Sequence, residues 1–181
     1  MPLQAWNMRR VKIFRENIYK ITHYHYFMEI EKAKFEDTLE ISELAQVLFR
    51  LHSDLDSYYA HNDKSLDVTV KAYGRWIRSN KFRVYVVKEN GSIVGFIIGK
   101  IEKDEPIYLR EEKGIVIALF VKDTYRERGL AKELFTYLSA WFKTKGISDI
   151  ELYVHANNVA AMGAWTKLGF IIDSHRMRRT I

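Results

Sequence analysis

Residues 115–170 read IVIALFV-KDTYRERG-LAKELFTYLSAWFKTKG-ISDIELYVH-ANN-VAAMGAWTKLGF. The first seven residues are apolar throughout and predict a buried strand, and residues 122–125 predict a turn. An apolar stripe at helical spacing then predicts a helix, and its members are Leu130, Leu134, Leu138 and Trp141. A second strand over residues 149–155 and a short helix over residues 159–168 follow. Two strands joined through one helix form a parallel pair with a right-handed crossover.

The start of the long helix has the composition of an anion site. Gly129 has no side chain to block a close approach, Ala131 is small, and the amides of a first helical turn have no partner within the helix. These amides and the helix dipole suit a pyrophosphate, and Arg126 and Arg128 add positive charge. The same pattern also fits an ordinary helix start, and both interpretations stay open at this point.

The second strand of the unit also runs into a helix start. It ends in His155-Ala156-Asn157-Asn158, and Asn158 is a good N-cap for the short helix that Gly169 closes. Both strands therefore end at the same edge of the sheet. If they splay there, their unpaired backbone groups can bind an extended, amide-bearing ligand as an added strand.

The segments before residue 115 complete the sheet. We expect a strand over residues 28–34, a helix that begins at Asp37 with Glu40 completing a capping box, and a second helix over residues 65–79. Strands over residues 82–88 and 92–102 are joined by Asn90-Gly91, a strong hairpin signal. The second of these strands is apolar on both faces and should lie in the centre of the sheet.

Residues 1–27 are predicted to be an N-terminal extension to a domain over residues 28–181. They mix aromatic and basic side chains without a clear period. The segment packs on the domain or reaches a second subunit to form a homodimer, or else Met28 is the natural start. His23 and His25 resemble a metal pair, but no third ligand lies near, so we expect surface histidines and no metal site.

Composition narrows the class of protein. A chain of 181 residues is most economically one domain. It has no apolar run of the roughly 18 residues that a membrane span needs and no signal peptide, so we expect no membrane partner and a cytoplasmic location. The absence of cysteine excludes disulfides and a cysteine nucleophile. The net charge of +6 is concentrated at the chain ends, where solvated tails are favoured over nucleic-acid binding.

Two motifs of the quoted stretch, taken together, resemble a known family. They are similar to the acyl-CoA-binding core of the GNAT acetyltransferase superfamily. The first motif is the run Leu119-Phe120-Val121 through Tyr125-Arg126-Glu127-Arg128-Gly129-Leu130-Ala131. The second is Asn158-Val159-Ala160-Ala161 followed by Trp165-Thr166-Lys167-Leu168-Gly169-Phe170. The resemblance implies an α/β fold of the mixed α+β kind, in which a central mixed sheet with a parallel, splayed strand pair is flanked by helices. It also implies an N-acetyltransferase that moves acetyl from acetyl-CoA directly to a primary amine in a ternary complex.

The resemblance further implies which residues bind acetyl-CoA. The backbone of residues 119–121 would lie along the pantetheine, the amides of residues 127–132 would bind the pyrophosphate, and Asn158 would hydrogen-bond the cofactor arm. The full implied set is Leu119, Phe120, Val121, Arg126, Glu127, Arg128, Gly129, Leu130, Ala131, Lys132, Asn158, Trp165 and Lys167.

The chain departs from the family pattern at the two positions that usually move protons. Trp165 stands where a tyrosine acid is typical, and Ile117 stands where a glutamate base is common. Proton transfer could run through water, or other residues could serve. Candidate substitutes are His155, whose imidazole suits a base near neutral pH, and the tyrosines Tyr153, Tyr58 and Tyr59. The remaining alternative is a non-catalytic acyl-CoA sensor or interaction module.

The acceptor side of the site is predicted from a loop and three carboxylates. The loop over residues 55–63 is polar and aromatic, and Asp56, Asp63 and Asp67 could hold a cationic amine. They could equally be capping or solvated carboxylates. The acceptor is therefore a small-molecule amine or a protein amine, and the sequence does not choose between them.

Overall fold

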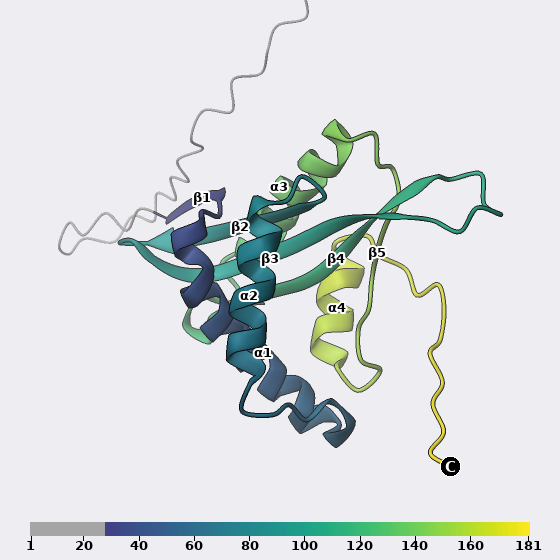
Figure 1. Ribbon diagram of the computed structural model, residues 1–181, viewed down its shortest axis with the longest axis horizontal. Helices are drawn as coiled ribbons and strands as arrows, with labels where there is room; N and C mark the ends of the chain where they lie inside the picture. The colour runs from purple at the N-terminus through teal and green to yellow at the C-terminus, as the bar shows by residue number, and fades with distance from the viewer. Residues whose placement is uncertain (1–27) are drawn as a thin grey trace, which may run out of the picture.

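A computed structural model describes residues 28–181 as a five-stranded mixed sheet flanked by helices (Figure 1). The strands are β1 (Met28–Lys32), β2 (Phe82–Glu89), β3 (Ser92–Lys103), β4 (Glu112–Val121) and β5 (Ile150–Leu152). The helices are α1 (Thr38–Leu55), α2 (Ser65–Arg78), α3 (Leu130–Thr144) and α4 (Val159–Lys167), with short 3₁₀ turns at η1 (Phe35–Asp37), η2 (Ser57–Tyr59) and η3 (Asp123–Tyr125). The expectations for residues 1–27, including those for His23 and His25, lie outside the described residues.

The strand order is the chain order, β1-β2-β3-β4-β5. Neighbours pair antiparallel up to β4, and β4 pairs parallel to β5 through the α3 crossover. The expected parallel pair is confirmed, and so is the central position of β3, the strand that is apolar on both faces over residues 93–98. The β2–β3 turn places Asn90 at φ 50° and Gly91 at φ 84°, the left-handed geometry that favours Asn-Gly in a two-residue hairpin.

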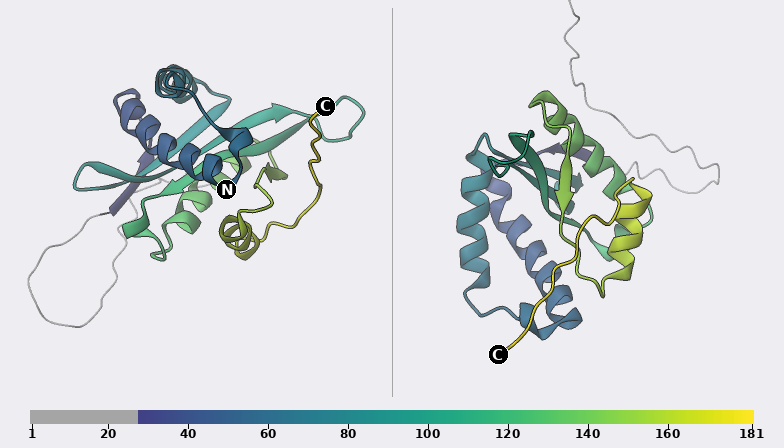
Figure 2. Two further views of the ribbon diagram at one scale, coloured as in Figure 1. Left: turned by 90° about the horizontal axis from the view of Figure 1, so that it is seen from below. Right: turned by 90° about the vertical axis from the view of Figure 1, so that its right-hand side faces the viewer.

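Helices cover both faces of the sheet, because its strands are apolar on both sides. Val84 and Val86 of β2 pack toward α1 and α2, whereas Tyr85 and Val87 pack toward α3. Figure 2 shows α1 and α2 on one side of the sheet and α3 with α4 on the other. Within residues 28–181, no helix is both long and apolar enough to cross a membrane.

The start of α1 differs from the predicted capping box. Asp37 does precede the helix, but its side chain makes no cap hydrogen bond to it. The buried carboxylate accepts from the backbone N–H of Lys34 at 2.7 Å and from Lys88 Nζ at 2.7 Å, while Glu40 accepts from the Ile93 amide at 2.8 Å. The expected reciprocal capping of α1 was therefore wrong. Asp37 caps the preceding turn η1 through the Lys34 amide and also binds Lys88 of β2, whereas Glu40 binds the Ile93 amide of β3.

Two strand boundaries also differ from the expectation. β4 begins at Glu112, before the apolar run at residues 115–121 that predicted it, because Arg110 and Lys113 pair with Asp104 and Glu151 at the base of the β3–β4 hairpin. β5 has three residues, although the apolar pattern predicted a strand over residues 149–155. The pairing of β5 with β4 stops at an irregularity in β4, which is described below.

Candidate functional site

A β-bulge at Ile117 opens the sheet between β4 and β5. Along the β3–β4 ladder, Ile98 pairs with Ala118 but the next residue, Gly99, pairs with Val116, so Ile117 is one extra residue in β4. The bulge reverses the alternation of the strand. Val116 and Leu119 pack toward α3, whereas Ala118 and Phe120 pack toward α1 and α2. A bulge bends and twists the strand that carries it.

Pairing between β4 and β5 stops where the bulge begins. The three paired positions are Gly114 with Ile150, Ile115 with Glu151, and Val116 with Leu152. Beyond Val116, β4 continues for five residues, and no strand of residues 28–181 pairs with it on the β5 side; Ile117 is 36% exposed there. The two strands therefore splay, and the backbone of residues 117–121 presents a free strand edge.

The N-terminus of α3 lies directly after this edge and lacks a cap. Its N-cap is Gly129, at φ 81°, with no side chain to accept a hydrogen bond, and a Cβ built there would meet no atom within 4 Å. In the described part of the chain, no hydrogen-bond acceptor pairs with the amides of residues 127–132. Glu127 also adopts a positive φ of 62°, which is costly for a residue with a side chain. These open amides form an anion-binding concavity.

The two arginines of this loop are tied back onto it. Arg126 forms an ion pair with Asp123 at 2.7 Å, and its Nε donates to the Val121 carbonyl at 3.3 Å. Arg128 donates to the Thr124 carbonyl at 2.9 Å and lies over the Tyr125 ring. Both side chains therefore shape the loop as well as supplying positive charge, and Lys132 extends that charge into the first turn of α3.

The second helix start is capped, as predicted. Asn158 Oδ1 accepts from the Ala161 amide at 3.0 Å, which leaves the side-chain NH₂ to donate to a ligand. Trp165 packs edge-on against Phe135 of α3 and Phe170, with ring centroids 5.8 and 5.3 Å away. This aromatic group attaches α4 to α3, and Lys167 is exposed at the end of α4.

On the opposite side of the splay, His155 meets the end of α1. His155 Nε2 lies 3.3 Å from Asp56 Oδ2, although 99 positions separate the two residues. Arg178 donates to the same Oδ2 at 2.5 Å and stacks over the Tyr58 ring at 4.2 Å. Tyr59 contacts the imidazole edge to face. Sequence reasoning placed Asp56 and His155 in the site but missed Arg178, whose only signal was a basic C-terminal segment.

Both ring nitrogens of His155 have partners. Nδ1 accepts from the Asn157 amide at 3.1 Å, so in this tautomer Nε2 carries the proton and donates to Asp56. The Tyr58 amide and the Arg178 guanidinium hold the pKa of Asp56 below its ordinary value. Burial and the charge of nearby His155 lower the pKa of His52. The cluster thus keeps a charged carboxylate facing cationic and aromatic groups.

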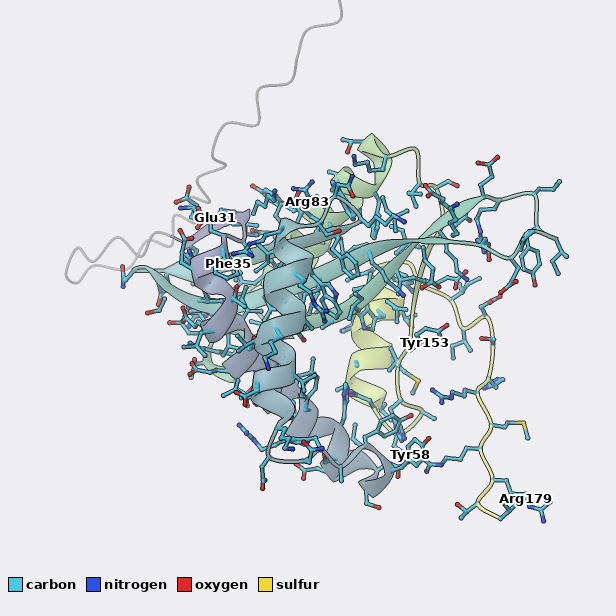
Figure 3. All side chains as sticks on the ribbon, in the orientation of Figure 1. Glu31, Phe35, Tyr58, Arg83, Tyr153 and Arg179 are labelled. Carbon is cyan, nitrogen blue, oxygen red and sulfur yellow. The ribbon has the colours of Figure 1, made fainter. Side chains whose placement is uncertain are left out.

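The other predicted acceptor-side residues separate into two groups. Tyr153 follows β5 directly and is 82% exposed beside the splay (Figure 3). Asp63 and Asp67 are exposed and lie outside the His155 cluster. A pocket of about 400 Å³ lies between the facing ends of α1 and α2, and its lining residues are Phe49, His52, Tyr59, His61, Ser65, Val68 and Thr69.

Comparison with known proteins agrees with this geometry. The sequence pattern of the Acetyltransferase (GNAT) family matches residues 41–170. The chain therefore belongs to the GNAT acetyltransferase family. It is 25% identical over 160 residues to the uncharacterized N-acetyltransferase MJ1207 of Methanocaldococcus jannaschii, a match that covers 84% of this chain and 63% of that relative. The chain thus spans less than two thirds of the relative's length.

Solved structures share the fold at low sequence identity. A tetramutant of the BH1408 protein from Bacillus halodurans superposes with a TM-score of 0.76 at 19% identity, covering 84% of this chain and 99% of that one. AAC(6')-Iy, in complex with the bisubstrate analogue CoA-S-monomethyl-acetylneamine, superposes with a TM-score of 0.67 at 17% identity, covering 85% and 97%. At these identities the likeness establishes the fold.

Proposed function

We propose that this protein is an acetyl-CoA-dependent N-acetyltransferase that transfers acetyl directly to a primary amine in a ternary complex. The observation that carries the proposal is the free edge of β4 at residues 117–121, which leads straight into the uncapped amides of residues 127–132. An extended ligand with amides at one end and a pyrophosphate at the other matches both features. The CoA-based bisubstrate analogue bound to AAC(6')-Iy supports the same assignment.

The residues present fit acetyl-CoA. Backbone groups of Leu119 and Val121 would hold the pantetheine, and the amides around Gly129 would hold the pyrophosphate. The Asn158 side-chain NH₂ would donate to the cofactor arm. When bound, acetyl-CoA supplies the activated acetyl group. Trp165 would support the cofactor site by packing α4 against α3. Positive charge around the site would come from Lys132, Lys167 and the two loop arginines, Arg126 and Arg128.

Proton transfer needs groups other than those at positions 117 and 165. The acceptor ammonium must lose a proton before its nitrogen attacks, and the departing thiolate must gain one. Ile117 and Trp165 offer no dissociable proton near neutral pH. We assign proton transfer to His155 and Tyr153, assisted by water. His155 can accept a proton at Nδ1 only when the Asn157 amide releases it.

Calorimetric titration of CoA and acetyl-CoA into the full chain tests the cofactor assignment. We expect micromolar affinity for the wild type and loss of binding in Gly129→Leu, because a side chain there occupies the space in front of the amides. Gly146→Leu is the matched control. Gly146 has a similar positive φ of 76° at the other end of α3, so it imposes comparable backbone strain away from the amides. Equal affinity in both variants would show that the loop assignment is wrong.

One alternative function has specific support. Ile117 is apolar at the opened edge, and Trp165 packs in an aromatic group. A non-catalytic acyl-CoA sensor needs no proton-transfer group at either position, so both residues also fit that function. A panel of amine acceptors, assayed for release of CoA thiol, separates the two functions. Sustained release with any amine supports the transferase. Tight acetyl-CoA binding without release across the panel supports the sensor.

A further inference from the structure

The guanidinium of Arg178 occupies a cation site that other residues have already formed. Its Nη2 lies 2.5 Å from Asp56 Oδ2, and its Cζ lies 4.2 Å from the centre of the Tyr58 ring. A carboxylate at one side and an aromatic face at the other are the two groups that recognise an alkylammonium or guanidinium ion. Figure 3 shows Tyr58 at the end of α1, with the C-terminal segment running past it.

Asp56 is held in place independently of Arg178. Its Oδ1 accepts from the Tyr58 amide at 3.0 Å, and its Oδ2 lies 3.3 Å from His155 Nε2. The Asp56 side chain is 18% exposed, whereas that of Arg178 is 43% exposed. The carboxylate and ring therefore belong to the folded domain, and the cation arrives from a segment without helix or strand.

The position of this cluster connects it to the acceptor side of the site. His155 joins Asp56 to the strand segment that leaves β5 at the splay. Tyr59, which contacts His155, also lines the pocket of about 400 Å³ between α1 and α2. An acceptor that enters the splay from the α1 side would meet Asp56 and Tyr58 beside His155.

We propose that Asp56 and Tyr58 form a subsite for a second cationic group of the acceptor, and that Arg178 is its internal occupant and competitor. This inference rests on the proposed function. It specifies the substrate class as an amine that carries at least one further positive charge, such as a polyamine. The acceptor binds only to molecules whose Arg178 has left the subsite. Its apparent Kd is therefore the intrinsic Kd divided by the fraction of such molecules.

The first test measures cation binding without turnover. Butylguanidinium is titrated into the full chain saturated with CoA, and butylurea, its neutral isostere, is the ligand control. We expect Arg178→Gln to tighten butylguanidinium binding by roughly five-fold, since a pair of this kind is part-exposed, and to leave butylurea unchanged. Arg179→Gln is the matched protein control, because Arg179 is exposed and lies on the side of the segment away from Tyr58 (Figure 3).

A second variant tests the carboxylate itself. Adding Asp56→Asn to the Arg178→Gln background should abolish the gain in butylguanidinium affinity. Melting temperatures of all variants establish that they are folded. If Arg178→Gln and Arg179→Gln bind butylguanidinium equally, or if Asp56→Asn leaves the gain intact, the subsite does not exist.

The turnover test connects the subsite to the acceptor and keeps the two proposals separable. With spermidine as the acceptor, Arg178→Gln should lower KM several-fold with kcat unchanged, relative to Arg179→Gln. The butylguanidinium titration is therefore repeated without CoA. Failure of CoA binding, with an intact butylguanidinium response in that titration, would refute the proposed function and leave the cation subsite standing. Turnover without a butylguanidinium response would refute the subsite alone. An intact cation response with unchanged spermidine KM would show that the acceptor does not use it.

Discussion

Among single residues, Ile117 marks the point at which β4 and β5 separate. It is the extra residue of the β4 bulge, and the last β4–β5 pair is the one just before it. Ile117 itself belongs to neither core cluster, and its neighbours Val116 and Ala118 pack on opposite faces of the sheet. Its role is therefore geometric, and a change of length tests it better than a change of side chain.

Deleting Ile117 should regularise the β3–β4 ladder while keeping Val116 and Ala118 on their present faces. We expect a folded protein with an unchanged or higher melting temperature and with CoA affinity lowered at least ten-fold, because β5 can then extend its pairing along β4. Ile117→Ala keeps the bulge and should retain CoA binding. Calorimetry on both variants decides, and unaltered affinity after the deletion would show that the bulge does not create the site.

Residue-scale electrostatics predict how stability responds to acid. The pKa of His52 lies below its ordinary value of 6.5, so between that value and the folded-state pKa the unfolded chain binds more protons than the folded one. Stability should therefore fall as pH drops below about 6.5, and His52→Gln should remove that part of the slope. Urea midpoints between pH 5 and pH 7 measure it. Parallel curves for the two proteins would contradict this origin.

Between secondary-structure elements, β3 and β4 approach each other so closely at Gly95 that a larger residue there would clash. A Cβ at Gly95 of β3 would lie 2.8 Å from the Phe120 carbonyl oxygen and 3.1 Å from Val87 Cγ1. The carbonyl belongs to the paired strand β4 and cannot rotate away as a side chain could. The spacing of β3 and β4 at the far end of the splayed edge, where Gly95 pairs with Val121, therefore depends on glycine.

Gly95→Ala should lower the free energy of unfolding by about 1–3 kcal/mol, the cost of forcing a methyl group into a packed interior. Gly163→Ala is the control, since Gly163 lies within α4 with open space around its Cα. That change should raise stability by roughly 0.5–1 kcal/mol through helix propensity. Urea unfolding of both variants provides the comparison, and a neutral Gly95→Ala would mean that the two strands can separate there.

At the scale of the whole molecule, the fold brings two distant parts of the chain to opposite sides of one opening. The splayed edge of β4 and the α3 amides lie on one side. Asp56, His155 and Arg178, from the end of α1, the segment after β5 and the C-terminal segment, lie on the other. We propose that these are the donor and acceptor sides of the site. A homodimer formed through residues 1–27 stays a separate prediction.

Local sequence determined most of the elements and the proposed donor side of the candidate site. The Asn90-Gly91 turn, the Asn158 cap, the central strand β3 and the uncapped Gly129 depend on backbone preferences and on residues within a few positions, so they could be read directly from the chain. Tertiary structure decided the rest. The bulge at Ile117 arises from its register with β3, Asp37 binds Lys88 in addition to its own helical turn, and Arg178 reaches Asp56 across 122 positions. Such contacts have no local pattern, because their free energy depends on which side chains the completed fold brings together.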